Sequence, residues 1–186
     1  MTRLLPAVLS GQFLPEAELN AARLDGEVFA VDECFQLVDS WEDSTTRGRC
    51  LAATLPPRLI AEQRTAAWVH GALLLPPRRH ELCAATGARF RALGAPRWVI
   101  REVVVNASDL WLLGGMMVTT PLRTVIDLAR FSAEFDSAEC ELVQRLASVG
   151  GFDYTEIQRA VGLRRNLPGK RRALERLHAA LALGDS

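Results

Sequence analysis

The sequence has few residues of the kinds that hold metals or form cross-links. It contains four cysteines and three histidines, and neither type is grouped. A structural zinc site usually takes its four ligands from two close pairs, and the one close pair here, His80 and Cys83, has no second pair beside it. We therefore expect no metal site, and we interpret Cys34, Cys50, Cys83 and Cys140 as free buried thiols in a reducing compartment.

Long apolar stretches are missing as well. No run reaches the roughly 18 apolar residues that a membrane-spanning helix needs. The apolar start, residues 4–9, is short, contains Pro6 and is soon followed by acidic residues, which is atypical of a signal peptide. We therefore expect a cytoplasmic protein that does not bind membranes.

Lysine is almost absent, since Lys170 is the only lysine among 22 basic residues. A PD-(D/E)xK nuclease needs a lysine two residues after an acid, whereas Lys170 follows Leu-Pro-Gly. A P-loop is excluded because six residues rather than four lie between Gly162 and Gly169, and Arg171 replaces the magnesium-binding hydroxyl. The paired carboxylates of a nucleotidyltransferase and a GxSxG elbow are absent too. The sequence predicts no enzyme and no cofactor, although a triad assembled from distant residues stays an open alternative.

Charge is balanced overall, with 22 basic and 22 acidic residues, but it is segregated along the chain. Residues 16–43 hold nine acidic residues and one arginine. Residues 58–101 hold eight arginines and two glutamates, and residues 159–176 hold seven basic residues and one glutamate. Binding to a charged partner must therefore come from local patches. The alternative is that these segments are only solvated faces.

Apolar periodicity and turn signals predict strands and helices in the first two thirds of the chain and helices alone after that. We predict helices at 15–24, 44–54 and 62–73, a hairpin of 28–31 and 34–38, an extended segment at 58–61, strands at 80–86, 98–105 and 109–118, and helices at 121–131, 136–149, 153–162 and 169–183. Gly114-Gly115 is typical of a hairpin or bulge within the last strand pair.

A sheet followed by helices is an α+β arrangement. We expect a small mixed sheet with flanking helices, then a C-terminal helical bundle, and a truncated winged-helix-like N-terminus. The predicted division is a winged-helix-like helix and hairpin at residues 1–43, and a second domain at 44–186 with a sheet part to 118 and a helical part at 120–183.

Three local patterns carry a resemblance to a known family: IAEQRTAAWVHG at 60–71, VTTPLRTVIDLAR at 118–130 and RRNLPGKRRAL at 164–174. Over about residues 25–183 the chain resembles AbiEi-type antitoxins and transcriptional regulators. We interpret the motif residues as structural, with Thr120 as a helix cap, Arg123 and Asp127 paired across one turn, and Trp68 packed on the sheet. The motif residues are Arg64, Trp68, Gly71, Thr120, Pro121, Arg123 and Asp127.

The resemblance implies an autorepressor with an N-terminal winged helix-turn-helix that neutralises a nucleotidyltransferase-like toxin. Here only about 24 residues precede the hairpin and the helix before it is acidic, so we do not expect DNA binding by that route. The candidate toxin contact is the acidic set Glu16, Glu18, Asp25, Glu27, Asp32 and Glu33. The candidate nucleic-acid contact is the basic set Arg164, Arg165, Lys170, Arg171 and Arg172.

The favoured hypothesis is an antitoxin that neutralises its cognate toxin by stoichiometric binding, with autoregulation of its operon through operator DNA as an additional role. A stand-alone DNA-binding regulator is the first alternative, supported by the basic tail. An atypical enzyme that modifies its toxin partner is the second. A toxin gene next door would separate the first hypothesis from the others.

Overall fold

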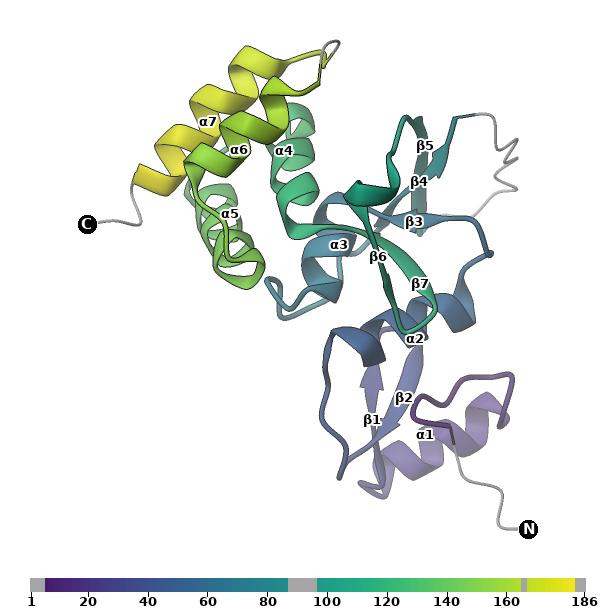
Figure 1. Ribbon diagram of the computed structural model, residues 1–186. Helices are drawn as coiled ribbons and strands as arrows, with labels where there is room; N and C mark the ends of the chain where they lie inside the picture. The colour runs from purple at the N-terminus through teal and green to yellow at the C-terminus, as the bar shows by residue number, and fades with distance from the viewer. Residues whose placement is uncertain (1–5, 87–96, 165–166, 183–186) are drawn as a thin grey trace.

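The computed structural model describes residues 6–86, 97–164 and 167–182. The predicted α+β fold is confirmed: a five-stranded mixed sheet lies between a small N-terminal unit and a helical bundle (Figure 1). The N-terminal unit holds helix α1 (Glu16–Leu24) and the antiparallel hairpin of β1 (Val28–Val31) and β2 (Cys34–Leu37). Its turn is made by Asp32 and Glu33, as expected, with Asp32 at a φ of 53°.

The main sheet consists of β3 (Ile60–Ala61), β4 (His80–Ala85), β5 (Trp98–Val103), β6 (Leu110–Leu113) and β7 (Met116–Thr119), in the order β5-β4-β3-β7-β6. The pairs β4–β5 and β3–β7 are parallel, whereas β3–β4 and β6–β7 are antiparallel. Gly114 and Gly115 form the two-residue turn between β6 and β7, with φ angles of 58° and 95°. Two successive positive φ angles are what a tight hairpin turn requires, and glycine adopts them without strain.

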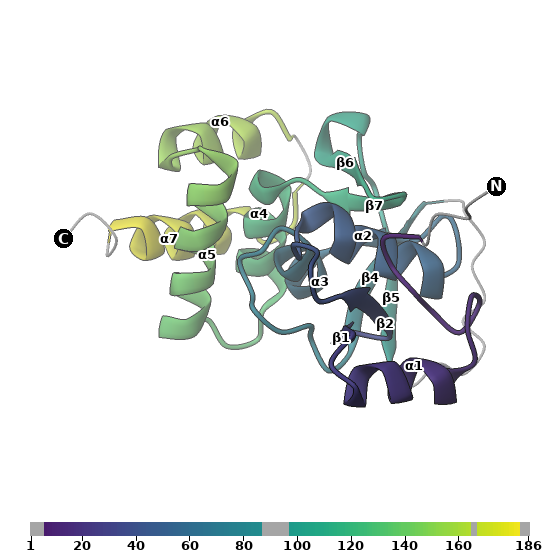
Figure 2. The ribbon, with the colours of Figure 1, turned by 90° about the horizontal axis from the view of Figure 1, so that it is seen from below.

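The helices of the second half form a bundle at one end of the molecule, which Figure 2 shows from below. They are α4 (Pro121–Phe131), α5 (Ser137–Gly150), α6 (Tyr154–Gly162) and α7 (Lys170–Ala182). Helix α4 leaves the sheet directly after β7 and packs against α5 and α7, and also against α3 (Gln63–Val69) of the sheet part. Helix α2 (Ser44–Thr54) packs on β7 and β6.

Helix α3 is shorter than the predicted 62–73. It ends at Val69 because Gly71 has a φ of 84° and closes the last turn. The amide of Gly71 donates to the Trp68 carbonyl at 3.0 Å and that of Ala72 to the Ala67 carbonyl at 2.9 Å. This is the hydrogen-bond pattern of a Schellman motif, whose left-handed position Gly71 occupies without strain.

Two apolar cores meet at α3. Trp68 is buried in the core of the sheet part, together with α2 and β4, whereas its neighbour Ala67 belongs to the core of the helical bundle. The N-terminal hairpin joins the first core through Val31 and Cys34. The division of the chain at residue 43 stays a prediction.

The four cysteines are free, and Cys34, Cys50 and Cys83 are buried as predicted. Cys140 is only half-buried, so that part of the prediction was wrong. Contact with the Cys34 thiol and burial raise the pKa of Cys50, and burial raises that of Cys83. Buried thiols of high pKa are chemically inert, which gives them a packing role.

Across the described residues, no group of three or more His, Cys, Asp or Glu side chains is placed to hold a metal ion. Within the same ranges, none of the helices has the length and apolar character needed to cross a membrane.

His70 gives the fold a dependence on pH. Its Nε2 lies 2.7 Å from the carbonyl oxygen of Thr119, and burial lowers its pKa below the ordinary 6.5. Below pH 6.5 the unfolded chain therefore takes up a proton that the folded chain resists, so stability falls as the pH drops toward the folded pKa. We expect the parent to lose more unfolding free energy than His70→Gln between pH 7.5 and pH 5.5, as measured by urea denaturation.

The exposed His178 provides the control for this prediction. It lies on α7 in edge contact with Tyr154, and His178→Gln should keep the pH dependence of the parent. Equal slopes for the parent and His70→Gln would show that another group causes the acid loss.

Candidate functional site

The candidate site begins with the way α4 leaves the sheet. Thr120 caps the helix, since its Oγ1 accepts a hydrogen bond from the Arg123 amide at 3.2 Å, and Pro121 occupies the first turn. Both features confirm the predicted helix start. The helix then buries every residue from Arg123 to Arg130, including three charged side chains. Charges are rarely buried unless they are paired, and these are paired with one another.

Asp127 is the centre of the first group of ion pairs. Its Oδ2 lies 2.7 Å from Nε of Arg123, which confirms the predicted pair, and its Oδ1 lies 2.9 Å from Nη1 of Arg130. The pair is buried, however, rather than exposed on the helix surface. Arg101 of β5 approaches Asp127 to 3.5 Å and pairs with both oxygens of Glu62. Glu62 itself is 1% exposed.

Asp109 is the centre of the second group. It lies in the short 3-10 helix η1 (Ala107–Asp109), where it forms a capping box with Asn106. Arg123 Nη1 donates to its Oδ2 at 2.9 Å, and Arg164, which follows α6, donates to its Oδ1. Arg123 therefore joins the two groups of ion pairs into one network.

The electrostatics of the arginines differ. Burial acts to lower the pKa of Arg123, but the carboxylates of Asp127 and Asp109 outweigh it and raise the pKa above its usual range. The pKa of Arg130 is lowered, because burial and the nearby charges of Arg123 and Arg101 outweigh the attraction of Asp127. Of Arg101, Arg123 and Arg130, Arg130 is therefore the one whose positive charge is least offset by nearby carboxylates.

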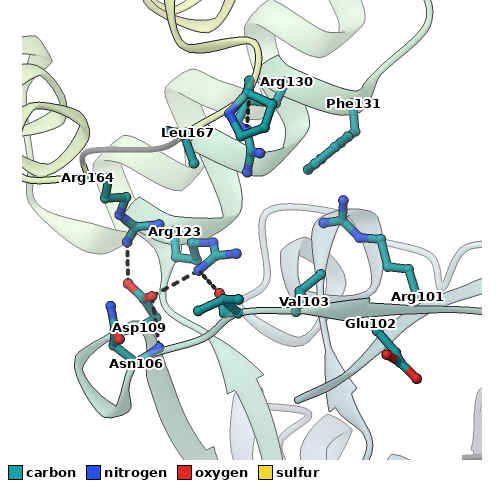
Figure 3. Close-up of a pocket in the computed structure, with 12 residues that line it drawn as sticks. Arg101, Glu102, Val103, Asn106, Asp109, Arg123, Arg130, Phe131, Arg164 and Leu167 are labelled. Carbon is teal, nitrogen blue, oxygen red and sulfur yellow. Dashed lines mark hydrogen bonds and ion pairs between the residues drawn. The ribbon is translucent and has the colours of Figure 1, made fainter. Parts of the chain in front are cut away.

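A cavity of about 460 Å³ opens beside the network. Figure 3 shows its wall, with Arg101 reaching up from β5 toward Phe131 and with Arg123 and Arg130 reaching down from α4. Phe131 is 46% exposed, and the centre of its ring lies 3.8 Å from the guanidinium carbon of Arg101 and 4.4 Å from that of Arg130. Cations so placed on an aromatic face are electrostatically attracted to it.

Comparison with known proteins identifies the family. The family model of the AbiEi antitoxin C-terminal domain matches residues 59–178. The chain belongs to this family. A solved structure, that of the RV2827C protein from Mycobacterium tuberculosis, matches at 18% identity with a TM-score of 0.39, over 95% of this chain and 76% of that chain. No curated protein matches.

Of the remaining motif residues of the AbiEi antitoxin domain, Arg64 links the sheet part to the bundle, whereas Trp68 and Gly71 act within the sheet part. Arg64 of α3 binds both oxygens of Glu139 on α5, at 2.6 and 2.9 Å. Trp68 is 1% exposed and packs in the sheet core, with the Arg47 guanidinium 5.4 Å from its ring centre. Gly71 closes α3. That the motif residues have a structural role alone stays a prediction.

The six acidic residues proposed for toxin binding are not equivalent. Glu16, Glu18, Asp25 and Glu27 are exposed on and just after α1. The Asp32 side chain is only 3% exposed; it lies 2.9 Å from His80 Nε2 and 2.9 Å from Arg97 Nη2, and these contacts lower its pKa despite burial. Glu33 pairs with the same Arg97. The last two residues therefore already have partners within the chain.

The basic set is divided as well. Arg164 pairs with Asp109, and Arg172 donates to the backbone carbonyl of Arg130. Arg171 is 93% exposed in its side chain, and Lys170 beside it is half-buried. Arg165 lies outside the described residues.

Several members of the site were not predicted. Spacing of four residues revealed the pair of Arg123 and Asp127, but Glu62, Arg101 and Asp109 come from distant parts of the sequence. Their only shared signal is a charge beside an apolar strand, which is too common to identify a site. Arg130 stood within the quoted motif, and its spacing of three from Asp127 could have identified it.

Proposed function

We propose that this protein is an antitoxin that neutralises a cognate nucleotidyltransferase-type toxin by binding it in equal amount, and that it also regulates its own operon. The observation that carries the proposal is membership of the AbiEi antitoxin domain family over residues 59–178. A binding inhibitor needs a complementary surface rather than a catalytic group, and the segregated charges supply one.

The proposed toxin contact is the acidic face of α1 and the turn after it. A toxin that binds nucleotides or tRNA presents a basic cleft. Acidic charge on the antitoxin would orient it toward that cleft and speed its association. Glu16 and Glu18 lie in the first turn of α1 and Glu27 lies just before β1, and all three are exposed. Asp32 and Glu33 form ion pairs with His80 and Arg97 of the main sheet part, so they would contribute indirectly by holding the turn in place.

The structure allows this contact to be tested without disturbing the hairpin. The variant Glu16→Gln/Glu18→Gln/Glu27→Gln removes three exposed charges and no described ion pair. We expect slower association with the toxin, by about tenfold at low salt, with a smaller difference at high salt because screening weakens the attraction. Surface plasmon resonance at two salt concentrations measures both rates.

A matched control removes three exposed glutamates elsewhere, in the variant Glu134→Gln/Glu141→Gln/Glu175→Gln. Two of these form exposed pairs, with Arg145 and Arg171, at 3.3 and 3.5 Å, which contribute little to stability. If both triple variants associate alike, the toxin contact lies elsewhere and the basic segment 58–101 is the next surface to test.

DNA binding is the second candidate function, and the two basic residues at the start of α7 favour it. Lys170 and Arg171 place two positive charges at the N-terminus of α7, where the helix dipole is also positive and repels them. A bound anion would offset this repulsion. If they contact phosphates, Lys170→Gln/Arg171→Gln should reduce the slope of log affinity against log salt by about 2. Fluorescence anisotropy with operator duplex measures the slope, and Arg23→Gln/Arg145→Gln is the matched control. An unchanged slope would remove this helix from any DNA interface.

A further inference from the structure

The cavity beside α4 contains nitrogen atoms that the protein itself does not use. Arg123 and Arg130 are only 4% and 8% exposed. Within the described ranges, Nη2 of each and Nη1 of Arg101 have no hydrogen-bond acceptor. In the same part of the chain, the one buried side-chain polar atom without a partner is Oε1 of Gln36. Because the three arginine nitrogens also lack a partner but are not among the buried atoms, solvent reaches them. All three arginines line the same cavity.

Charge at the cavity is in excess on the positive side. Four arginines line the cavity, and only three carboxylates contact them. The carboxylate of Glu102, which also lines the cavity, points away from the other side chains in Figure 3. The lowered pKa of Arg130 agrees with this surplus, since burial and the neighbouring guanidinium groups both disfavour its charge. The arginines are Arg101, Arg123, Arg130 and Arg164, and the carboxylates are Glu62, Asp109 and Asp127. An anion bound here would offset the repulsion between the arginines.

The number of unused donors indicates the kind of anion. Three nitrogens from three side chains are best satisfied by a group with three acceptor oxygens, which a phosphate monoester has and a carboxylate lacks. A volume of about 460 Å³ lies in the range of small-molecule sites and leaves room beyond the phosphate. The apolar part of the wall, which includes Val103 and Leu167, suits an organic body.

We propose that this cavity binds a small organic phosphate monoester of about mononucleotide size. Its phosphate would lie among Arg101, Arg123 and Arg130, and its organic part would lie toward Phe131 and Leu167. The cavity is walled by β5 and η1 on one side and, on the other, by α4 and by Arg164, Leu167 and Pro168, which lie between α6 and α7. The ligand would therefore contact both the sheet part and the bundle. Binding would therefore stabilise the whole domain against thermal unfolding.

The test uses the full chain and defined probes. In isothermal titration calorimetry, AMP and GMP should bind at one site per chain and raise the thermal midpoint, with inorganic phosphate binding more weakly. Adenosine lacks the phosphate and citrate carries only carboxylates, so neither should bind. The proposal is overturned if no phosphate monoester binds, or if adenosine or citrate binds as tightly as AMP.

Two variants place the binding in this cavity. Arg164→Gln and Phe131→Leu change side chains that are 21% and 46% exposed, so both should fold, as circular dichroism would verify. Arg164→Gln removes the positive surplus of the cavity and Phe131→Leu removes its aromatic wall, so each should weaken AMP binding by about tenfold. Arg145→Gln, at an exposed position on α5, should bind like the parent. Parental affinity in both cavity variants would contradict the assignment.

A competition experiment identifies the source of the phosphate. If a short oligonucleotide displaces AMP only when it carries a 5′-phosphate, the cavity also accepts the end of a nucleic acid. If only free nucleotides compete, the ligand is a small metabolite. Equal displacement by phosphorylated and unphosphorylated oligonucleotides would show recognition of diesters and would overturn the proposal.

Discussion

Replacing Asp127 by asparagine is expected to destabilise the protein by about 3–5 kcal/mol, because removal of one partner leaves buried charges uncompensated. The Asp127 side chain is 1% exposed and contacts Arg123 at 2.7 Å and Arg130 at 2.9 Å. Asparagine has nearly the same size, so the loss reports charge rather than packing. Its amide group would also place two donors against guanidinium groups that only donate. Urea denaturation followed by circular dichroism measures the change.

The control for this prediction is Glu141→Gln, which removes a carboxylate from an exposed pair with Arg145 at 3.3 Å. Such pairs contribute at most about 1 kcal/mol. The two variants therefore separate the buried network from surface charge in general. If Asp127→Asn lost no more stability than Glu141→Gln, the network at α4 would not stabilise the domain.

Replacing Gly48 by alanine is expected to destabilise the protein by about 3 kcal/mol, at the upper end for an overpacked core. Gly48 lies in the middle of α2, where a Cβ atom would be 2.1 Å from the carbonyl oxygen of Leu113 and 2.7 Å from its carbon. Both atoms belong to the backbone of the β6–β7 hairpin, so no side-chain rotation can relieve the clash. The hairpin would have to move away from α2.

The sign of this effect is informative, because alanine is favoured over glycine in a helix by about 1 kcal/mol. Gly162 provides the comparison: it is the last residue of α6, and a Cβ there would meet nothing within 4 Å. Gly162→Ala should be neutral or stabilising by up to about 1 kcal/mol. Thermal unfolding of both variants measures the contrast, and a neutral Gly48→Ala would mean that α2 and the hairpin are not in close contact.

Local signals were sufficient to predict most elements of this fold. Thr120-Pro121 marked the start of α4, and Gly114-Gly115 marked the β6–β7 turn. The predicted end of α3 was wrong because of the backbone conformation of one residue: the helix ends early since Gly71 adopts a positive φ. Turn residues and apolar periodicity act over a few positions, and the sequence displays them directly.

Tertiary pairing could not be predicted in the same way. Strand β3 has only two residues, yet it lies in the middle of the sheet, where Ile60 pairs with Cys83 on one side and Met117 on the other. The candidate site depends on such distant contacts, since Arg101 binds Glu62 across 39 positions. No short-range pattern encodes these pairings, so the sequence suggested the motif of α4 but not the cavity beside it.

The central claim is that this member of the AbiEi antitoxin family acts by binding its toxin, and a titration tests it most directly. The cognate toxin, once gene order identifies it, is held at a fixed concentration well above the dissociation constant. Its nucleotidyltransferase activity is measured while the purified chain is added. Binding predicts that inhibition rises linearly and is complete at about one equivalent, with or without ATP. Full protection at a small fraction of one equivalent, especially if it required ATP, would contradict the account and favour an enzyme that modifies the toxin.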